Sequence, residues 1–99
     1  MAQFSVYRLQ SDGELVVDCQ SELLEHLNTR LVVPLILRER APMPAQRLNP
    51  VFTIDGTEFV MVTQFASAVQ RSDLGETVAS LEERAFDVIG ALDVLMSGV

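Results

Sequence analysis

The last twenty residues, 80–99, constrain the fold most, because they carry one long apolar stripe. Its apolar residues recur at alternating spacings of four and three: Leu81, Ala85, Val88, Leu92 and Leu95. This period predicts a helix that covers another element with one face. Ser80 and Glu83 have the spacing of a capping box at its start, and Gly98 is typical of a helix end.

Three further apolar residues, Phe86, Ile89 and Met96, widen the stripe beyond one packing face. We therefore expect the helix either to bury a second flank or to contact a partner. The helix carries no His, Lys, Cys or Tyr, so it offers little chemistry of its own.

The composition indicates a single domain, residues 1–99. Hydrophobic residues make up 48% of the 99, which is enough for a modest core. No apolar run is long enough to span a bilayer and no signal peptide is visible, so we expect a cytoplasmic protein without a membrane partner.

The only cysteine, Cys19, leaves no internal disulfide, and we expect it to be a small buried hydrophobe. The net charge of −7 argues against nonspecific binding to DNA or RNA.

Alternating and apolar runs before the helix predict strands, at residues 3–9, 15–19, 30–37, 51–54 and 58–63. Turn residues connect the first two runs at 11–13, and Asp55-Gly56-Thr57 connects the last two, so each pair predicts a hairpin. Pro34 lies in the third run. Because proline cannot donate a hydrogen bond to a ladder, it predicts a sheet edge or a bulge there.

Three segments lack a clean strand signal. Residues 21–27 resemble a short helix or a loop, and 38–50 contain three prolines and predict a long connection. Residues 65–74 are interrupted by the polar stretch 70–73, and 75–76 lead toward the helix. The sum predicts a mainly β fold, a small antiparallel β domain with a C-terminal α-helix.

Several short motifs, taken in order, resemble the CcdB family of bacterial toxin–antitoxin toxins. They are Gln-Phe-x-Val-Tyr at 3–7, Val-Asp-x-Gln-Ser-x-Leu-Leu at 17–24, Arg-Leu-Val-Val-Pro-Leu at 30–35, Met-Val-Thr at 61–63, Gly-Glu at 75–76 and Gly-Val at 98–99. No single motif is diagnostic, but their joint order and the total length make the resemblance specific. It implies an SH3-like antiparallel β barrel of the type that the CcdB, MazF and Kid toxins share.

The resemblance also implies a function. CcdB toxins are homodimers that bind the A subunit of DNA gyrase, trap the cleaved-DNA complex and do no covalent chemistry of their own. A partly disordered antitoxin, CcdA, neutralises the toxin. The toxin–antitoxin complex represses its own operon, so operator DNA is contacted only through that complex. No cofactor is implied, and the sequence has no evident metal cluster, phosphate loop or Ser-His-Asp set.

The gyrase contacts of the family can be placed on this chain only where positions match. Two apolar residues after the Gln-Ser pair correspond to Leu23 and Leu24, and the helix tip supplies the rest, Asp93, Met96, Ser97, Gly98 and Val99. At position 97 the best-known family pattern has a tryptophan that stacks on a gyrase arginine. Losing such an anchor typically costs about 2 kcal/mol or more. We therefore expect weaker gyrase binding, different contacts, or lost poisoning.

Arg38, Arg40 and Arg47 cluster in the proline-containing connection of an otherwise acidic chain. An acidic antitoxin tail could order there and pair with these arginines. A solvated loop is an equally good interpretation of the same residues.

Two other functions stay open. The MazF and Kid toxins resemble this fold and cleave RNA, and Arg30, Arg38, Arg40 or His26 with a carboxylate could attempt that reaction. The acidic balance and the absence of lysine argue against RNA as a substrate. A non-toxic homologue kept as a co-repressor is the third possibility.

Overall fold

The computed structural model describes residues 2–98, and the strands in this range form one antiparallel sheet. The strands are β1 (Ser5–Leu9), β2 (Leu15–Asp18), β3 (Thr29–Leu37), β4 (Val51–Ile54), β5 (Thr57–Met61), β6 (Ser67–Gln70) and β7 (Leu74–Ser80). Their order is β4-β5-β3-β2-β1-β7, and β6 pairs with the first part of β3. One α-helix, α1 (Ala85–Ser97), follows the sheet. Four 3-10 helices lie between these elements: η1 (Glu22–Leu24), η2 (Thr63–Phe65), η3 (Arg71–Asp73) and η4 (Glu82–Arg84). The mainly β fold with a C-terminal helix is thus confirmed.

Both predicted hairpins form. In the β4–β5 hairpin, Ile54 pairs with Thr57, and the two residues between them have φ of 51° at Asp55 and 79° at Gly56. Positive φ at both positions is the signature of a type I′ turn, whose twist matches that of the flanking strands. The β1–β2 hairpin pairs Val6 with Val17.

Pro34 lies in the central strand β3, opposite Val16 of β2, so the prediction of a sheet edge was wrong. Its backbone faces the gap between two partners, because β6 pairs with β3 up to Val32 and β5 pairs from Leu35 onward. The Pro34 carbonyl accepts a hydrogen bond from the Val62 amide at 3.0 Å. The missing amide donor therefore falls where no strand needs it.

The sequence pattern missed strand β7, which pairs with β1. Of its seven residues only Leu74 is buried, so the strand has no apolar alternation to detect. Strand β1 also begins later than predicted, at Ser5. Phe4 has φ of 71°, a left-handed conformation that a bulky residue rarely adopts. Its amide donates to the Asp18 carbonyl and its carbonyl accepts from the Leu81 amide, which holds this unusual turn in place.

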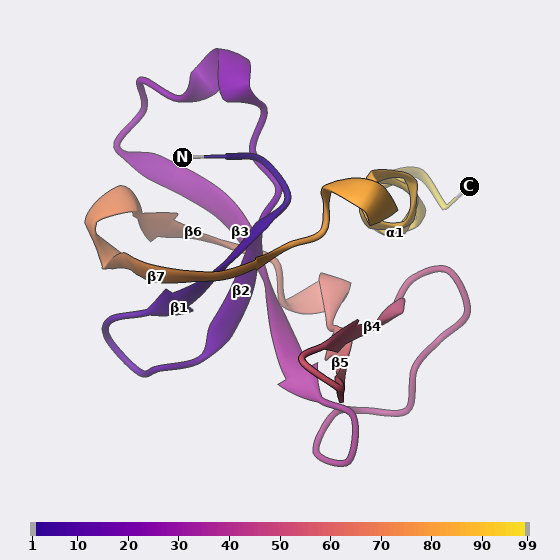
Figure 1. Ribbon diagram of the computed structural model, residues 1–99. Coiled ribbons are helices and arrows are strands. Elements are labelled where there is room, and N and C mark those ends of the chain that lie inside the picture. Colours follow the sequence, from indigo (N-terminus) through magenta and orange to yellow (C-terminus); the bar gives the residue numbers. More distant parts are fainter. Residues whose placement is uncertain (1, 99) are drawn as a thin grey trace.

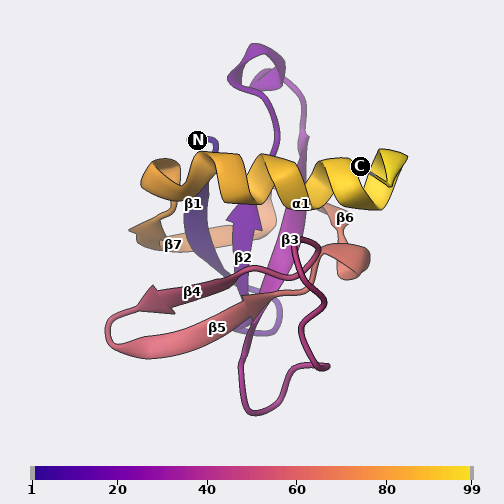
Figure 2. The same cartoon turned by 90° about the vertical axis from the view of Figure 1, so that its right-hand side faces the viewer.

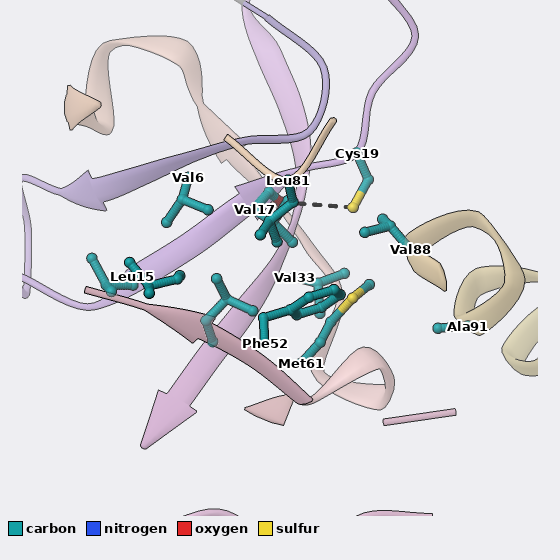
Figure 3. Packing of buried hydrophobic residues seen from close by; sticks show 12 residues of the cluster. Val6, Leu15, Val17, Cys19, Val33, Phe52, Met61, Leu81, Val88 and Ala91 are labelled. Carbon is teal, nitrogen blue, oxygen red and sulfur yellow. Dashed lines mark hydrogen bonds between the residues drawn. The ribbon is translucent and has the colours of Figure 1, made fainter. Parts of the chain in front are cut away.

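The sheet curls into a half-barrel, with β4 and β7 at the two ends of the strand order and β6 attached beside β3 (Figure 1). Alternate residues of β1, β2 and β3 face opposite sides. One side packs a small cluster within the curl, of Tyr7, Val16, Val32 and Leu74. The other side packs the main core against the β4–β5 hairpin and α1, with Val17, Val33, Phe52, Met61 and Val88 among its members (Figure 3). Both faces of these strands are therefore buried.

Helix α1 crosses the β1, β2 and β3 strands, with the β4–β5 hairpin beside it (Figure 2). The predicted capping box does not form, because β7 continues through Ser80 and the turn η4 comes next. The Ser80 hydroxyl accepts from the Glu82 amide rather than from that of Glu83, and α1 begins only at Ala85. No helix within residues 2–98 is long and apolar enough to cross a membrane.

Candidate partner-binding surface

The C-terminal end of α1 extends beyond the core. Val88 and Ala91 are fully buried, whereas Leu95 is 43% exposed and Met96 is 83% exposed. The apolar stripe therefore packs in its first half and becomes accessible in its second. Phe86, at 92% exposure, shows that the N-terminal part of the helix also presents an apolar side chain that the core does not use.

The tip of α1 has a defined end. Gly98 has φ of 76°, as predicted for a glycine at a helix end, and its amide donates to the Val94 carbonyl at 2.9 Å. The Ser97 hydroxyl donates to the Asp93 carbonyl at 2.8 Å. Asp93, Met96, Ser97 and Gly98 are all exposed, and Val99 lies outside the described residues. The tip is thus an ordered helix end whose exposed side chains fill no part of the core.

Leu23 and Leu24 lie on η1, in the loop between β2 and β3. Leu23 is 88% exposed and Leu24 is 44% exposed. The Ser21 hydroxyl caps η1 by accepting from the Leu23 amide at 3.2 Å. The loop therefore presents two adjacent leucines to the surroundings instead of burying them.

A buried ion pair lies at the base of this loop. The Arg30 guanidinium lies 2.8 Å from the Asp18 carboxylate, and both side chains have zero exposure. The other Asp18 carboxylate oxygen accepts from the Gln20 amide at 3.0 Å, and the Arg30 Nη2 atom donates to the Gln20 carbonyl at 3.3 Å. The pair thus fixes the backbone where β2 leads into the loop.

The sequence matches the model of the CcdB protein family over residues 3–98. The chain belongs to the CcdB family. Membership supports a toxin of a toxin–antitoxin system, and it agrees with the curled antiparallel sheet and the C-terminal helix described above.

Within one chain, the two groups of residues that the family resemblance assigns to gyrase contacts do not come together. The η1 loop with Leu23 and Leu24 lies at one end of the molecule, and the α1 tip projects at a separate place (Figures 1 and 2). A target that touches both groups must either span this separation or meet residues from two chains.

The three arginines that were proposed for the antitoxin site from their clustering in the connection are also spread out. Arg38 pairs with Glu58 at 3.2 Å, with both side chains about half exposed. Arg40 lines a hollow of about 250 Å³ with Arg8 and other residues of the β1–β2 hairpin. Arg47 lines another hollow, of about 340 Å³, beside Phe86 of α1. The long connection therefore distributes its charges over several faces.

The residues considered for RNA cleavage lie in different surroundings. Arg30 has no exposure, so it cannot reach a substrate, and sequence reasoning missed its pairing with Asp18. His26 is exposed on the loop. Burial, with a smaller effect of the Asp18 charge, raises the pKa of the Cys19 thiol to about 12, so this thiol stays protonated, as a buried hydrophobe should. Within residues 2–98 no group of His, Cys, Asp and Glu side chains could hold a metal ion.

The signal that could have located the ion pair was present in the sequence. Asp18 and Arg30 are charged residues placed in apolar strand runs, where an unpaired charge would be very costly. Such residues are usually paired with each other when they are buried. The register of β2 against β3, with Asp18 opposite Val32, was the missing fact.

Proposed function

We propose that this CcdB-family protein binds the A subunit of DNA gyrase and traps it on cleaved DNA, without enzymatic activity of its own. The observation that carries the proposal is the α1 tip. Met96, Ser97 and Gly98 are exposed, lie at a capped helix end and are not used by the core, as a surface kept for a partner would be. The matching contacts on the loop, Leu23 and Leu24, are also exposed apolar residues.

Ser97 makes this contact weaker than one anchored by tryptophan. Its side chain bonds back to the Asp93 carbonyl and leaves Met96 as the largest exposed apolar side chain of the tip. Methionine is flexible and fits irregular apolar surfaces, so it can replace part of an aromatic contact. We therefore propose that gyrase binding persists with reduced affinity.

A homodimer would supply the residues that one chain keeps apart. Exposed apolar side chains lie on η2 and on the two elements that it contacts, β3 and α1: Leu31, Phe65, Leu95 and Met96. An isologous contact across this face would place two α1 tips side by side. Light scattering at micromolar concentration is expected to give twice the monomer mass, and a monomer at that concentration would exclude this arrangement.

A CcdA-like antitoxin is the second proposed partner. An acidic, disordered segment could fold onto the connection and pair with Arg38, Arg40 and Arg47. The resulting complex would then contact operator DNA and repress the operon, since the toxin itself carries net charge −7. In this proposal the protein acts in the cytoplasm, where gyrase and the operon are found.

The function is tested by incubating purified protein with gyrase, ATP and supercoiled plasmid, and in parallel with RNA. Linear DNA that appears only when gyrase is present, with RNA left intact, is the expected result. Omitting gyrase gives the control for contaminating nuclease. RNA fragments in place of linear DNA would instead support the MazF-like alternative, and neither product would support the co-repressor alternative.

A further inference from the structure

The loop between β2 and β3 presents Leu23 and Leu24 without an apolar anchor of its own. None of residues 21–28 is buried. The hydrogen bonds inside the loop close only local turns, such as the one from the Leu27 amide to the Leu24 carbonyl at 3.1 Å. A segment with few buried contacts opens easily, so the shape of this loop depends on polar contacts from outside it.

The Gln20 side chain makes one of these contacts and links it to strand β3. The Gln20 Nε2 atom donates to the Leu24 carbonyl at 3.2 Å and to the Thr29 carbonyl at 3.0 Å, and Oε1 accepts from the Leu31 amide at 2.9 Å. Both amide hydrogens and the acceptor are thus engaged. The carboxamide joins the carbonyl that directly follows the leucine pair to the end of the loop and to strand β3.

Gln20 is itself held rigidly. Its backbone amide donates to Asp18 and its backbone carbonyl accepts from Arg30, and these two residues form the fully buried ion pair. A second residue, Arg71, holds the later half of the loop, with its Nη1 atom donating to the Glu25 carbonyl at 2.6 Å. Gln20 is therefore the link between the buried pair and the leucine-bearing turn.

We propose that Gln20 is a positioning residue of the target-binding surface. Its carboxamide keeps the loop ordered, so the protein partner meets Leu23 and Leu24 already in place. Pre-organisation raises affinity because the loop is already ordered before binding, so binding does not have to supply the conformational entropy lost on ordering it. The proposal rests on the proposed function for its partner, the gyrase A subunit, but the order of the loop can be measured without that partner.

The test uses Gln20→Glu in the full-length protein, with Gln46→Glu as the matched control. Glu has the same size as Gln and keeps the acceptor for the Leu31 amide. It replaces the donating Nε2 by a carboxylate oxygen, which the Leu24 and Thr29 carbonyl oxygens repel. Gln46 is exposed and lies in the 38–50 connection, away from the loop. We expect faster amide hydrogen exchange across 22–28 and an affinity for gyrase A about tenfold lower, from two lost hydrogen bonds. The control should change neither.

A double-mutant cycle with Leu23→Ala separates positioning from a general structural effect. If Gln20 acts through the loop, the affinity loss of the double variant is smaller than the product of the two single losses. Multiplicative losses, or a Gln20→Glu variant that binds gyrase A as tightly as the parent, would overturn the positioning role while leaving gyrase binding intact. A parent protein that does not bind gyrase A would overturn the proposed function, and this inference with it.

Discussion

Arg30 and Asp18 form an ion pair of 2.8 Å from which solvent is completely excluded. The Arg30 Nη1 atom is also buried, and it has no hydrogen-bond partner among residues 2–98. The cost of removing the guanidinium from water is therefore only partly offset by its partners. The pair contributes less to net stability than to geometry, because it fixes the Gln20 backbone at the start of the loop.

Breaking this pair on one side should be severe. Arg30→Met leaves the Asp18 carboxylate buried without its partner, and we expect a loss of about 3–5 kcal/mol in the free energy of unfolding. The double variant Asp18→Leu with Arg30→Met should recover most of that loss and still show faster amide exchange in residues 22–28. Urea denaturation measures the stability. If both variants are equally unstable, the pair is a main source of stability and this interpretation is wrong.

Gly75 should not tolerate a side chain. A Cβ atom there would lie 2.7 Å from the Arg8 carbonyl oxygen, which belongs to the neighbouring strand β1. Gly75→Ala must push β7 away from β1, and we expect a cost of about 1–3 kcal/mol. Gly90→Ala is the matched control, because a Cβ atom at this position of α1 meets nothing within 4 Å. The control should stabilise the protein by about 0.5–1 kcal/mol. Thermal unfolding of the two variants, with shifts of opposite sign, checks the prediction.

Cys19 should make the protein less stable in alkali. Burial raises the pKa of this thiol from 9.0 to about 12, so between these values the unfolded chain loses the proton and the folded chain keeps it. The unfolded state then binds fewer protons, and the free energy of unfolding falls as pH rises, by about 1.4 kcal/mol per pH unit. The contribution is complete below pH 9. Cys19→Ala should remove this fall in the free energy of unfolding between pH 9 and 12, as measured by urea titrations at several pH values. If the variant shows the same dependence on pH as the parent, the prediction is wrong.

The α1 tip should control toxicity without controlling the fold. Gly98→Glu, or a few residues added after Val99, should abolish cell killing, since a bulky or charged tip cannot enter a tight partner pocket. Gly98→Asn is the control for backbone strain, because asparagine accepts the left-handed conformation seen at this position. The melting temperature should change little in all three. Cells that remain just as poisoned by the extended protein would remove the tip from the target site.

Ser97→Trp should strengthen gyrase binding. The hydroxyl that it removes is exposed and bonds only within the helix end, so the fold loses little. A restored aromatic anchor is expected to raise affinity roughly thirtyfold, which corresponds to about 2 kcal/mol. Surface plasmon resonance with the gyrase A subunit measures the change. An unchanged or lower affinity would show that Met96 and Asp93 have reshaped the contact.

The arginines of the long connection should act through charge. Arg38→Glu with Arg40→Glu is expected to weaken antitoxin binding and to leave the remaining affinity less sensitive to salt, because cationic contacts are lost. The fold should tolerate the change, since the Arg38–Glu58 pair is about half exposed and such pairs contribute about 1 kcal/mol or less. Titration calorimetry at two salt concentrations provides the measurement. Equal affinity would remove both residues from the antitoxin site.

The sequence by itself determined the features that depend on neighbouring residues. Asp55 and Gly56 predicted the β4–β5 hairpin because a two-residue turn needs positive φ at both positions. Gly98 predicted the end of α1 for the same reason. Leu81 and Val88 were placed on the buried face because helical spacing sets which residues share a side. Leu23 and Leu24 were assigned to gyrase contacts only through the family resemblance; both side chains are exposed, and their role stays a prediction.

Only the tertiary structure decided the features that depend on partners distant in sequence. β7 is a strand because β1 offers it a hydrogen-bonding edge, and its side chains carry no period that could have indicated this. Pro34 is accepted in a central strand because two different strands meet β3 on either side of it. Asp18 and Arg30, twelve residues apart in the chain, are buried together because β2 folds against β3. Local spacing cannot encode these pairings, since the free energy of each depends on a contact that exists only after the chain has folded.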